Sequence, residues 1–181
     1  PDILALQETK LVDEKFPREA VAAAGYQCVF SGQKTYNGVA ILSRVAGADV
    51  VTAIPGLDDP QKRVLAATFG DVRVVDLYVP NGESVESDKY RYKLDWLARL
   101  RDFLAQELAR HPKLIVLGDF NIAPAPEDVH DPAAWEGHVL FSEPERAAFR
   151  ALLALGLHDA FRLFPQPEKS YSWWDYRMMG F

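Results

Sequence analysis

Short apolar runs that end in polar residues recur along the chain, and this pattern constrains the fold more than any other feature. The predicted strands lie at 3–6, 38–43, 64–69, 72–79 and 113–117. The runs before and after Gly70-Asp71 are rich in β-branched residues, which predicts a hairpin. Strands that include a hairpin and are mixed with helices indicate an α/β domain with mixed sheets rather than a purely parallel one.

Three further segments have helical patterns. The predicted helices lie at 16–24, ending at Gly25, at 88–110, ended by Pro112, and from a Ser142–Glu145 capping box to Gly156. The 88–110 segment carries an apolar stripe at helical spacing, and we interpret its charged residues as solvent-exposed surface. The proline-rich stretch 123–132 is predicted to be a loop.

Composition limits the class of protein. The 181 residues are enough for one domain, and no apolar run approaches the ~20 residues needed to cross a membrane. A single cysteine, Cys28, excludes an internal disulfide and fits the reducing cytoplasm. A protein that binds nucleic acid only through its phosphates is expected to be basic, so the net charge of −6 argues mildly against that class. Carboxylates around a metal ion, however, also make a chain acidic.

Polar side chains follow three of the predicted strands. Glu8 follows the first strand, Asn81 the 72–79 strand, and Asp119 and Asn121 the 113–117 strand. Because the carboxyl ends of strands form the ligand crevice in open α/β sheets, these residues make a candidate site. Their oxygen donors suit Mg²⁺ or Mn²⁺ and disfavour structural zinc. A surface glutamate and an ordinary Asp-x-Asn turn are the simpler alternatives.

The two-residue spacing of Asp119 and Asn121 in Gly118-Asp119-Phe120-Asn121 predicts the directions of their side chains. If the backbone stays extended, Asp119 and Asn121 point the same way and Phe120 points into the core. Gly118 then allows a close approach of the chain to its neighbour.

Six sequence blocks follow one another along the chain. They are Leu6-Gln7-Glu8-Thr9-Lys10, Tyr36-Asn37-Gly38-Val39-Ala40-Ile41, Tyr78-Val79-Pro80-Asn81-Gly82, Gly118-Asp119-Phe120-Asn121-Ile122, Gly156-Leu157-His158-Asp159-Ala160-Phe161-Arg162 and Ser172-Trp173-Trp174-Asp175-Tyr176-Arg177. In content and in order these blocks resemble exonuclease III-type apurinic/apyrimidinic endonucleases, which belong to the endonuclease/exonuclease/phosphatase superfamily. The last block points to the DNA-repair branch.

The resemblance implies a four-layer α/β sandwich in which two mixed β-sheets pack face to face between helices. It implies Mg²⁺, with Mn²⁺ as a substitute, bound at Glu8. The implied catalytic residues are Tyr78 on the phosphate, Asp119 as the residue that activates water, and Asn121. The predicted substrate-binding residues are Asn81, Trp173 and Arg177, with Trp173 at the minor-groove side.

The resemblance also implies function. The expected enzyme is an exodeoxyribonuclease III that acts on double-stranded DNA. It is expected to remove nucleotides from 3′ ends and to cleave 5′ to abasic sites. The protein is expected to be a cytoplasmic monomer that does not bind membranes. Residues 1–181 are expected to form one domain that lacks the family's first strand and its C-terminal strands. Two alternatives stay open: a superfamily phosphatase acting on small or lipid phosphates, and a non-catalytic DNA-binding fragment.

Overall fold

The computed structural model describes residues 1–174, which form two compact units. The first unit comprises residues 1–79 and 105–120, and the second comprises residues 80–104 and, within the described chain, 121–174. The first unit holds β1 (Ile3–Gln7), η1 (Asp13–Lys15), α1 (Arg18–Ala23), β2 (Gln27–Ser31), β3 (Val39–Ser43), β4 (Ala48–Val51), β5 (Val64–Phe69), β6 (Val72–Tyr78) and β7 (Leu114–Asp119). The second holds most of α2 (Asp88–Arg110), with η2 (Pro126–Asp128), α3 (Pro132–Trp135) and α4 (Glu143–Leu153).

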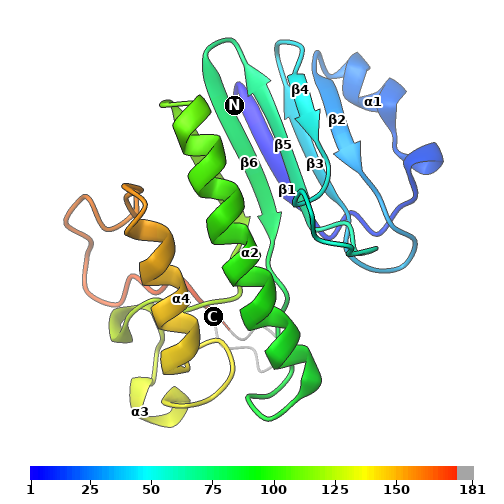
Figure 1. The fold of residues 1–181 in the computed structure, drawn as a ribbon. Coiled ribbons are helices and arrows are strands. Elements are labelled where there is room, and N and C mark those ends of the chain that lie inside the picture. The colour runs from blue at the N-terminus through cyan, green and yellow to red at the C-terminus, as the bar shows by residue number, and fades with distance from the viewer. Residues whose placement is uncertain (175–181) are drawn as a thin grey trace. The chain divides into compact units, whose positions relative to one another are not determined.

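Two sheets make up the first unit. One is antiparallel with the strand order β1-β3-β2, and the other is mixed with the order β4-β5-β6-β7, in which β6 and β7 are parallel. Strands of the two sheets contact each other, so that β1 lies alongside β6 (Figure 1). The two-sheet α/β architecture predicted from the sequence is confirmed, with the qualification that the smaller sheet is antiparallel throughout its described strands.

The space between the two sheets is filled by aliphatic side chains. Val39 and Ile41 of β3 and Leu65 of β5 are fully buried there, together with Val74 of β6. These side chains alternate along their strands, as expected where one face of a sheet packs against another. The packing of the two sheets fixes the positions of the strand ends, which carry the predicted site residues.

Several local predictions are confirmed. β5 and β6 form the expected hairpin around Gly70, whose φ of 63° lies in the left-handed region that glycine tolerates. The helix α2 has the predicted bounds, and α4 begins at the predicted capping box.

Two strands formed by apolar runs are exposed on one face. Leu4 in β1 is 41% exposed and Ile115 in β7 is 49% exposed, so neither strand is covered on both faces. Each lies at the edge of its sheet among the described strands, where fewer neighbours cover an outward-pointing side chain. The apolar runs predicted the strands correctly but could not show their places in the sheets.

The charged residues of α2 are not all surface residues, which corrects the sequence-based prediction. Lys93 and Glu107 are fully buried. Within the first unit, Glu107 Oε2 lies 2.5 Å from Nε of the buried Arg73. A buried charge is tolerated only with such a partner, and a partner distant in the sequence leaves no trace in a helical pattern.

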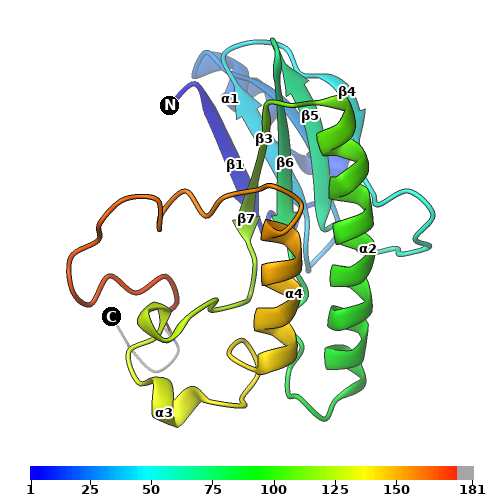
Figure 2. The same cartoon turned by 60° about the vertical axis from the view of Figure 1, so that its left-hand side comes forward.

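The second unit has a small aromatic and aliphatic core. Ala123, Val129 and Phe141 are buried, and Trp135 and Trp173 pack against them. The proline-rich stretch is mostly a loop, as predicted, but it also contains η2 and the start of α3. After α4 the described chain continues without helix or strand, shown in orange to red in Figure 2.

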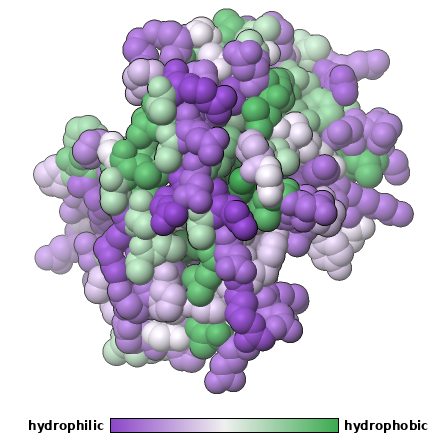
Figure 3. Space-filling model, in the orientation of Figure 1, coloured by the Kyte–Doolittle hydropathy of each residue, from purple (hydrophilic) through white to green (hydrophobic). Residues whose placement is uncertain are grey.

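The surface is largely polar in the view of Figure 3, where hydrophilic side chains (purple) cover most of the face and hydrophobic ones (green) are scattered among them. Among the described helices, none combines the length and the apolar character that a membrane span requires.

Candidate active site

Glu8 leaves the end of β1 in a strained backbone conformation. Its φ is 54° and that of Lys10 is 57°, both in the left-handed region that non-glycine residues rarely adopt. The segment is held in place by backbone hydrogen bonds from Thr9 N to Gly38 O (3.2 Å) and from Lys10 N to Asn37 O (2.9 Å). A Cβ at Gly38 would lie 2.2 Å from Thr9 Oγ1, and the φ of Gly38 is 90°, so glycine suits this position beside the turn. Strain of this kind persists where the surroundings impose it, and it is typical of functional sites.

The carboxylate of Glu8 is held between a phenol and an ammonium group. The Tyr78 hydroxyl, at the end of β6, donates a hydrogen bond to Glu8 Oε1. Lys10 Nζ lies 2.8 Å from Glu8 Oε2. Burial of the Tyr78 ring, followed by its hydrogen bond to Glu8, raises the pKa of the phenol well above its ordinary value. Tyr78 therefore keeps its proton at neutral pH and acts as a hydrogen-bond donor.

Arg63 fixes the position of Tyr78. Tyr78 N donates to Arg63 O (2.8 Å), and Arg63 Nη1 donates to Tyr78 O (3.0 Å). The guanidinium carbon also lies 4.7 Å from the centre of the tyrosine ring, within the range of a cation–π contact. Its positive charge lowers the pKa of Tyr78 by less than burial and Glu8 raise it.

Asp119 lies next to Tyr78 on the neighbouring strand. The two residues are register partners of the parallel pair β6–β7, and Val79 N donates to Asp119 O (2.9 Å). A Cβ at Gly118 would lie 2.0 Å from Leu77 O, which confirms that this glycine is needed for the close approach of the strands. The first unit therefore brings Glu8, Tyr78 and Asp119 together, and both carboxylate residues are exposed.

Asp76, which the sequence patterns did not single out, lies two residues before Tyr78 in β6. Asp76 in β6 is fully buried, and its Oδ1 accepts a hydrogen bond of 2.6 Å from Gln7 Nε2. Among the described residues, its Oδ2 has no hydrogen-bond partner. Burial raises the pKa of Asp76 to about 7. The only signal in the sequence is an aspartate inside a strand whose one other charged residue is Arg73.

The second unit brings two predicted carboxamides together. Asn81 Nδ2 donates to Asn121 Oδ1 at 3.3 Å. Asn121 has a φ of 48°, so the backbone does not stay extended beyond Asp119 and the alternation argument fails at this position. The left-handed conformation is one that asparagine tolerates better than most residues.

Trp173 has the contacts of a half-buried core residue. Its ring centre lies 4.5 Å from that of Trp135 in an edge-to-face arrangement, and its backbone N donates to Asp128 O (3.1 Å). The next residue, Trp174, is 42% exposed. A role for Trp173 in DNA recognition stays a prediction, and Arg177 lies outside the described residues.

Glu8 is the residue that fits a divalent metal ion. No group of three or more His, Cys, Asp or Glu residues suited to a metal ion occurs within the part of the chain that the structure describes. Mg²⁺ is nevertheless held in many phosphate-handling enzymes by one or two carboxylates and by oxygens of the substrate. An exposed carboxylate fixed by a strained backbone fits that mode of binding.

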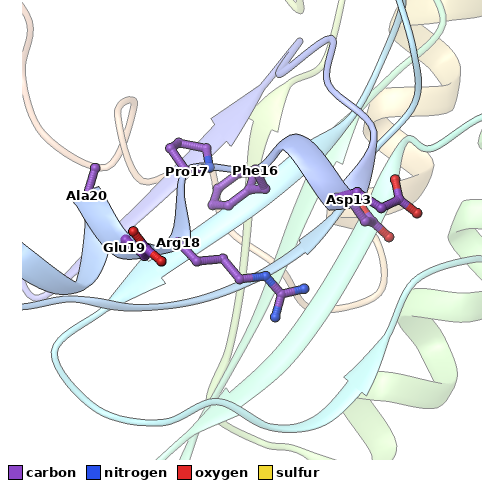
Figure 4. Close-up of a pocket in the computed structure, with 7 residues that line it drawn as sticks. Asp13, Phe16, Pro17, Arg18, Glu19 and Ala20 are labelled. Atoms are coloured by element: carbon purple, nitrogen blue, oxygen red, sulfur yellow. The ribbon is translucent and has the colours of Figure 1, made fainter.

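A surface pocket lies elsewhere in the first unit, along η1 and α1 (Figure 4). It is lined by Asp13, Glu14, Phe16, Pro17, Arg18, Glu19 and Ala20. None of these is a predicted site residue, so the pocket is distinct from the Glu8–Tyr78–Asp119 group.

Comparison with known proteins assigns the family. The model of the endonuclease/exonuclease/phosphatase family matches residues 1–179. This chain belongs to that family. It is 34% identical to exodeoxyribonuclease III of Haemophilus influenzae, with 100% of this chain and 73% of that protein aligned. It is 33% identical to the DNA repair nuclease APEX1 of Danio rerio, with 98% of this chain and 59% of that protein aligned.

Solved structures support the same assignment. The 3′–5′ exonuclease NExo from Neisseria meningitidis is 50% identical, with a TM-score of 0.96 and coverage of 99% of this chain and 71% of that one. An AP endonuclease from Archaeoglobus fulgidus is 38% identical, with a TM-score of 0.92 and coverage of 99% and 70%. The resemblance stated from the sequence is confirmed: the chain is a hydrolytic nuclease of the family's DNA-repair branch. Nucleases of this family generally depend on a divalent metal ion.

Proposed function

We propose that this nuclease uses Mg²⁺ to hydrolyse phosphodiesters of double-stranded DNA, removing nucleotides from 3′ ends and cleaving 5′ to abasic sites. The observation that carries the proposal is the grouping of Glu8, Tyr78 and Asp119 at the ends of three strands. A carboxylate for a metal ion, a neutral donor and an exposed carboxylate are the groups that metal-assisted hydrolysis of a phosphodiester requires.

Each of the three residues has a distinct role. Glu8 holds Mg²⁺, which when bound neutralises charge on the phosphate and on the leaving oxygen. When substrate binds, Tyr78 redirects its one hydroxyl proton from Glu8 to a phosphate oxygen, and its raised pKa keeps the phenol protonated for that purpose. Asp119 orients the attacking water and accepts its proton.

The two asparagines contact the substrate in the proposed mechanism. Asn121 binds the scissile phosphate through its carboxamide, which donates hydrogen bonds without adding negative charge. Asn81 binds the same region of the substrate, and its hydrogen bond to Asn121 supports a shared role. Arg177 and Trp173 are proposed to contact the DNA duplex.

Processing of 3′ ends is the activity best supported by the comparisons. The structures at 50% identity are of a 3′–5′ exonuclease and of the 3′ phosphatase NExo bound to a product DNA hairpin. The AP endonuclease structure is less similar, at 38% identity. We further propose that the enzyme acts as a monomer in the cytoplasm, where its single cysteine stays reduced.

A substrate panel tests the proposal. The protein at its natural length is assayed with Mg²⁺ on a duplex with recessed 3′ ends, a 3′-phosphorylated duplex, a duplex with one abasic site, and an inositol phosphate. We expect turnover of the DNA substrates, fastest at 3′ ends, and no turnover of the inositol phosphate. Hydrolysis of the inositol phosphate alone would identify a small-molecule phosphatase, and binding of DNA without any cleavage would identify a non-catalytic DNA-binding protein.

A further inference from the structure

A buried lysine holds the backbone of both site asparagines. Lys93 of α2 is fully buried. Its Nζ donates to Asn81 O at 3.1 Å and to Asn121 O at 2.6 Å, and it forms an ion pair with Glu145 of α4. Asn81 and Asn121 are 40 residues apart in the sequence, and this one ammonium group contacts the main chain of both.

Glu145 is itself fixed by the first turn of α4. Its side chain is fully buried, and its carboxylate accepts hydrogen bonds from Leu140 N (3.0 Å), Ser142 N (3.2 Å) and Ser142 Oγ (2.5 Å). The Tyr90 hydroxyl lies 2.5 Å from Ser142 Oγ and links this cap to α2. The partner of Lys93 therefore has little freedom to move, which fixes the ammonium group as well.

The loop after Asn81 also packs against the lysine. A Cβ at Gly82 would lie 3.2 Å from Lys93 Cδ and 3.4 Å from Tyr90 Cδ2. Gly82 has a φ of 98°, which only glycine adopts readily. Both the stem and the charged end of Lys93 thus determine where the chain around Asn81 lies.

Stability alone does not explain a buried ion pair at this place. Removing two charges from water costs free energy that their attraction often does not recover, and well-packed apolar residues can stabilise a fold equally well. An apolar pair, however, cannot donate hydrogen bonds to two carbonyl groups. The contribution specific to Lys93 is to hold the carbonyls of Asn81 and Asn121 at one point.

We propose that Lys93, oriented by Glu145, is a positioning residue that sets the relative placement of the Asn81 and Asn121 carboxamides. The inference rests on the function proposed above for these two asparagines. Holding both main chains on one ammonium group keeps Asn81 Nδ2 within 3.3 Å of Asn121 Oδ1 and maintains the left-handed backbone of Asn121. The two amides then meet the substrate as one preorganised pair, without having to be ordered when DNA binds.

The test replaces the ion pair as a unit. Lys93→Met with Glu145→Gln removes both charges, preserves side-chain length and leaves no unpaired charge in the interior. We expect kcat on recessed 3′ ends to fall roughly 10- to 100-fold, the scale of a small misplacement of binding groups, with a much smaller change in KM. Lys93→Gln with Glu145→Gln is the milder second variant: it also leaves no unpaired charge in the interior, its amide can still donate to a carbonyl, and it should reduce kcat less, in the same direction.

The matched control is the other buried ion pair. Arg73 and Glu107 are 2% and 1% exposed, and neither contacts Asn81 or Asn121 in the described contacts. Arg73→Met with Glu107→Gln should lower the melting temperature comparably but leave kcat within about twofold at temperatures where the protein is folded.

Coupling to the two asparagines decides the inference. In a background with both Asn81→Ala and Asn121→Ala, replacing the Lys93–Glu145 pair should reduce kcat by less than about twofold, because both carboxamides that it positions are gone. The same 10- to 100-fold loss in both backgrounds, or an equal loss of kcat in the Arg73–Glu107 control, would overturn the positioning role alone. Wild-type turnover of Asn121→Ala would instead refute the proposed function of the asparagine, and the inference with it.

Discussion

The Tyr78 hydroxyl donates a hydrogen bond to the carboxylate of Glu8 and so joins the ends of strands from two different sheets. The two residues are 70 positions apart in the sequence. Glu8 raises the pKa of the phenol in addition to the effect of burial, so the Tyr78 hydroxyl keeps its proton and remains a hydrogen-bond donor beside this carboxyl group.

Removing the phenol hydroxyl tests the donor role of Tyr78. We expect Tyr78→Phe to reduce the single-turnover rate about 10²- to 10³-fold, the typical cost of losing one preorganised donor to a developing negative charge. Tyr26→Phe is a matched control, because the Tyr26 hydroxyl donates to Pro1 O at 2.7 Å, away from the predicted site residues. Comparable rates for Tyr78→Phe and Tyr26→Phe would show that the Tyr78 hydroxyl does not act on the substrate.

Glu8 is expected to carry the metal ion. Mg²⁺ should raise the melting temperature of the wild-type protein, because a ligand that binds only the folded state stabilises it. Glu8→Gln removes the charge while keeping the shape, so it should abolish this increase and most turnover. Titration of Mg²⁺ by differential scanning fluorimetry measures the effect without any catalytic readout. An undiminished increase in the variant would place the metal ion on other residues.

Asp76 should make the stability of the protein depend on pH. Its pKa is raised from an ordinary 3.8 to about 7 in the folded state, so the folded protein binds the proton more tightly than the unfolded chain. The free energy of unfolding then decreases as pH rises from about 4 to about 7, by at most ~4 kcal/mol. Asp76→Asn keeps an acceptor for Gln7 and should remove most of this dependence.

Urea unfolding at pH 5 and pH 8 measures this difference. The wild-type protein should be less stable at pH 8, and Asp76→Asn should gain stability relative to the wild type at that pH. Parallel pH profiles for the two proteins would mean that Asp76 has the same pKa in the folded and unfolded states.

Trp173→Ala separates core packing from DNA recognition. Because Trp173 packs edge-to-face on Trp135 and against the small core of the second unit, its loss should lower the melting temperature. A recognition role predicts in addition a roughly tenfold loss of preference for abasic over intact duplexes, the scale of one stacking contact. Trp135→Ala is the control for destabilisation alone. If both variants show the same unchanged preference, Trp173 is a core residue only.

The elements that were predicted from the sequence are those whose structure is determined by residues close together in the chain. The 88–110 helix follows from its periodicity, and the β5–β6 hairpin follows from Gly70 between two β-branched runs. The strands β2 and β4 were not predicted, because Gln27–Ser31 and Ala48–Val51 are short and lack a distinctive pattern. The places of strands within the sheets depend on pairing between distant segments, which a single sequence does not display.

Site residues could be predicted from the sequence only where a polar side chain follows a predicted strand or lies in a motif shared with the family. Glu8, Tyr78 and Asp119 were identified in this way, and the first unit brings them together. Lys93 looked like an ordinary surface lysine, because its burial depends on Glu145, 52 residues further along the chain. Asp76 was missed for the same reason, since its partner Gln7 lies 69 residues earlier.

Single-turnover cleavage by Asp119→Asn tests the central claim most directly. Asp119 is the exposed carboxylate beside Tyr78, and the amide keeps its shape but cannot accept a proton from water. With enzyme in excess over a duplex with recessed 3′ ends, we predict a rate about 10²- to 10⁴-fold below the wild type, with unchanged melting temperature and DNA affinity. A rate within a few-fold of the wild type in a folded, DNA-binding variant would contradict the assignment of Asp119 as the base and the site built around it.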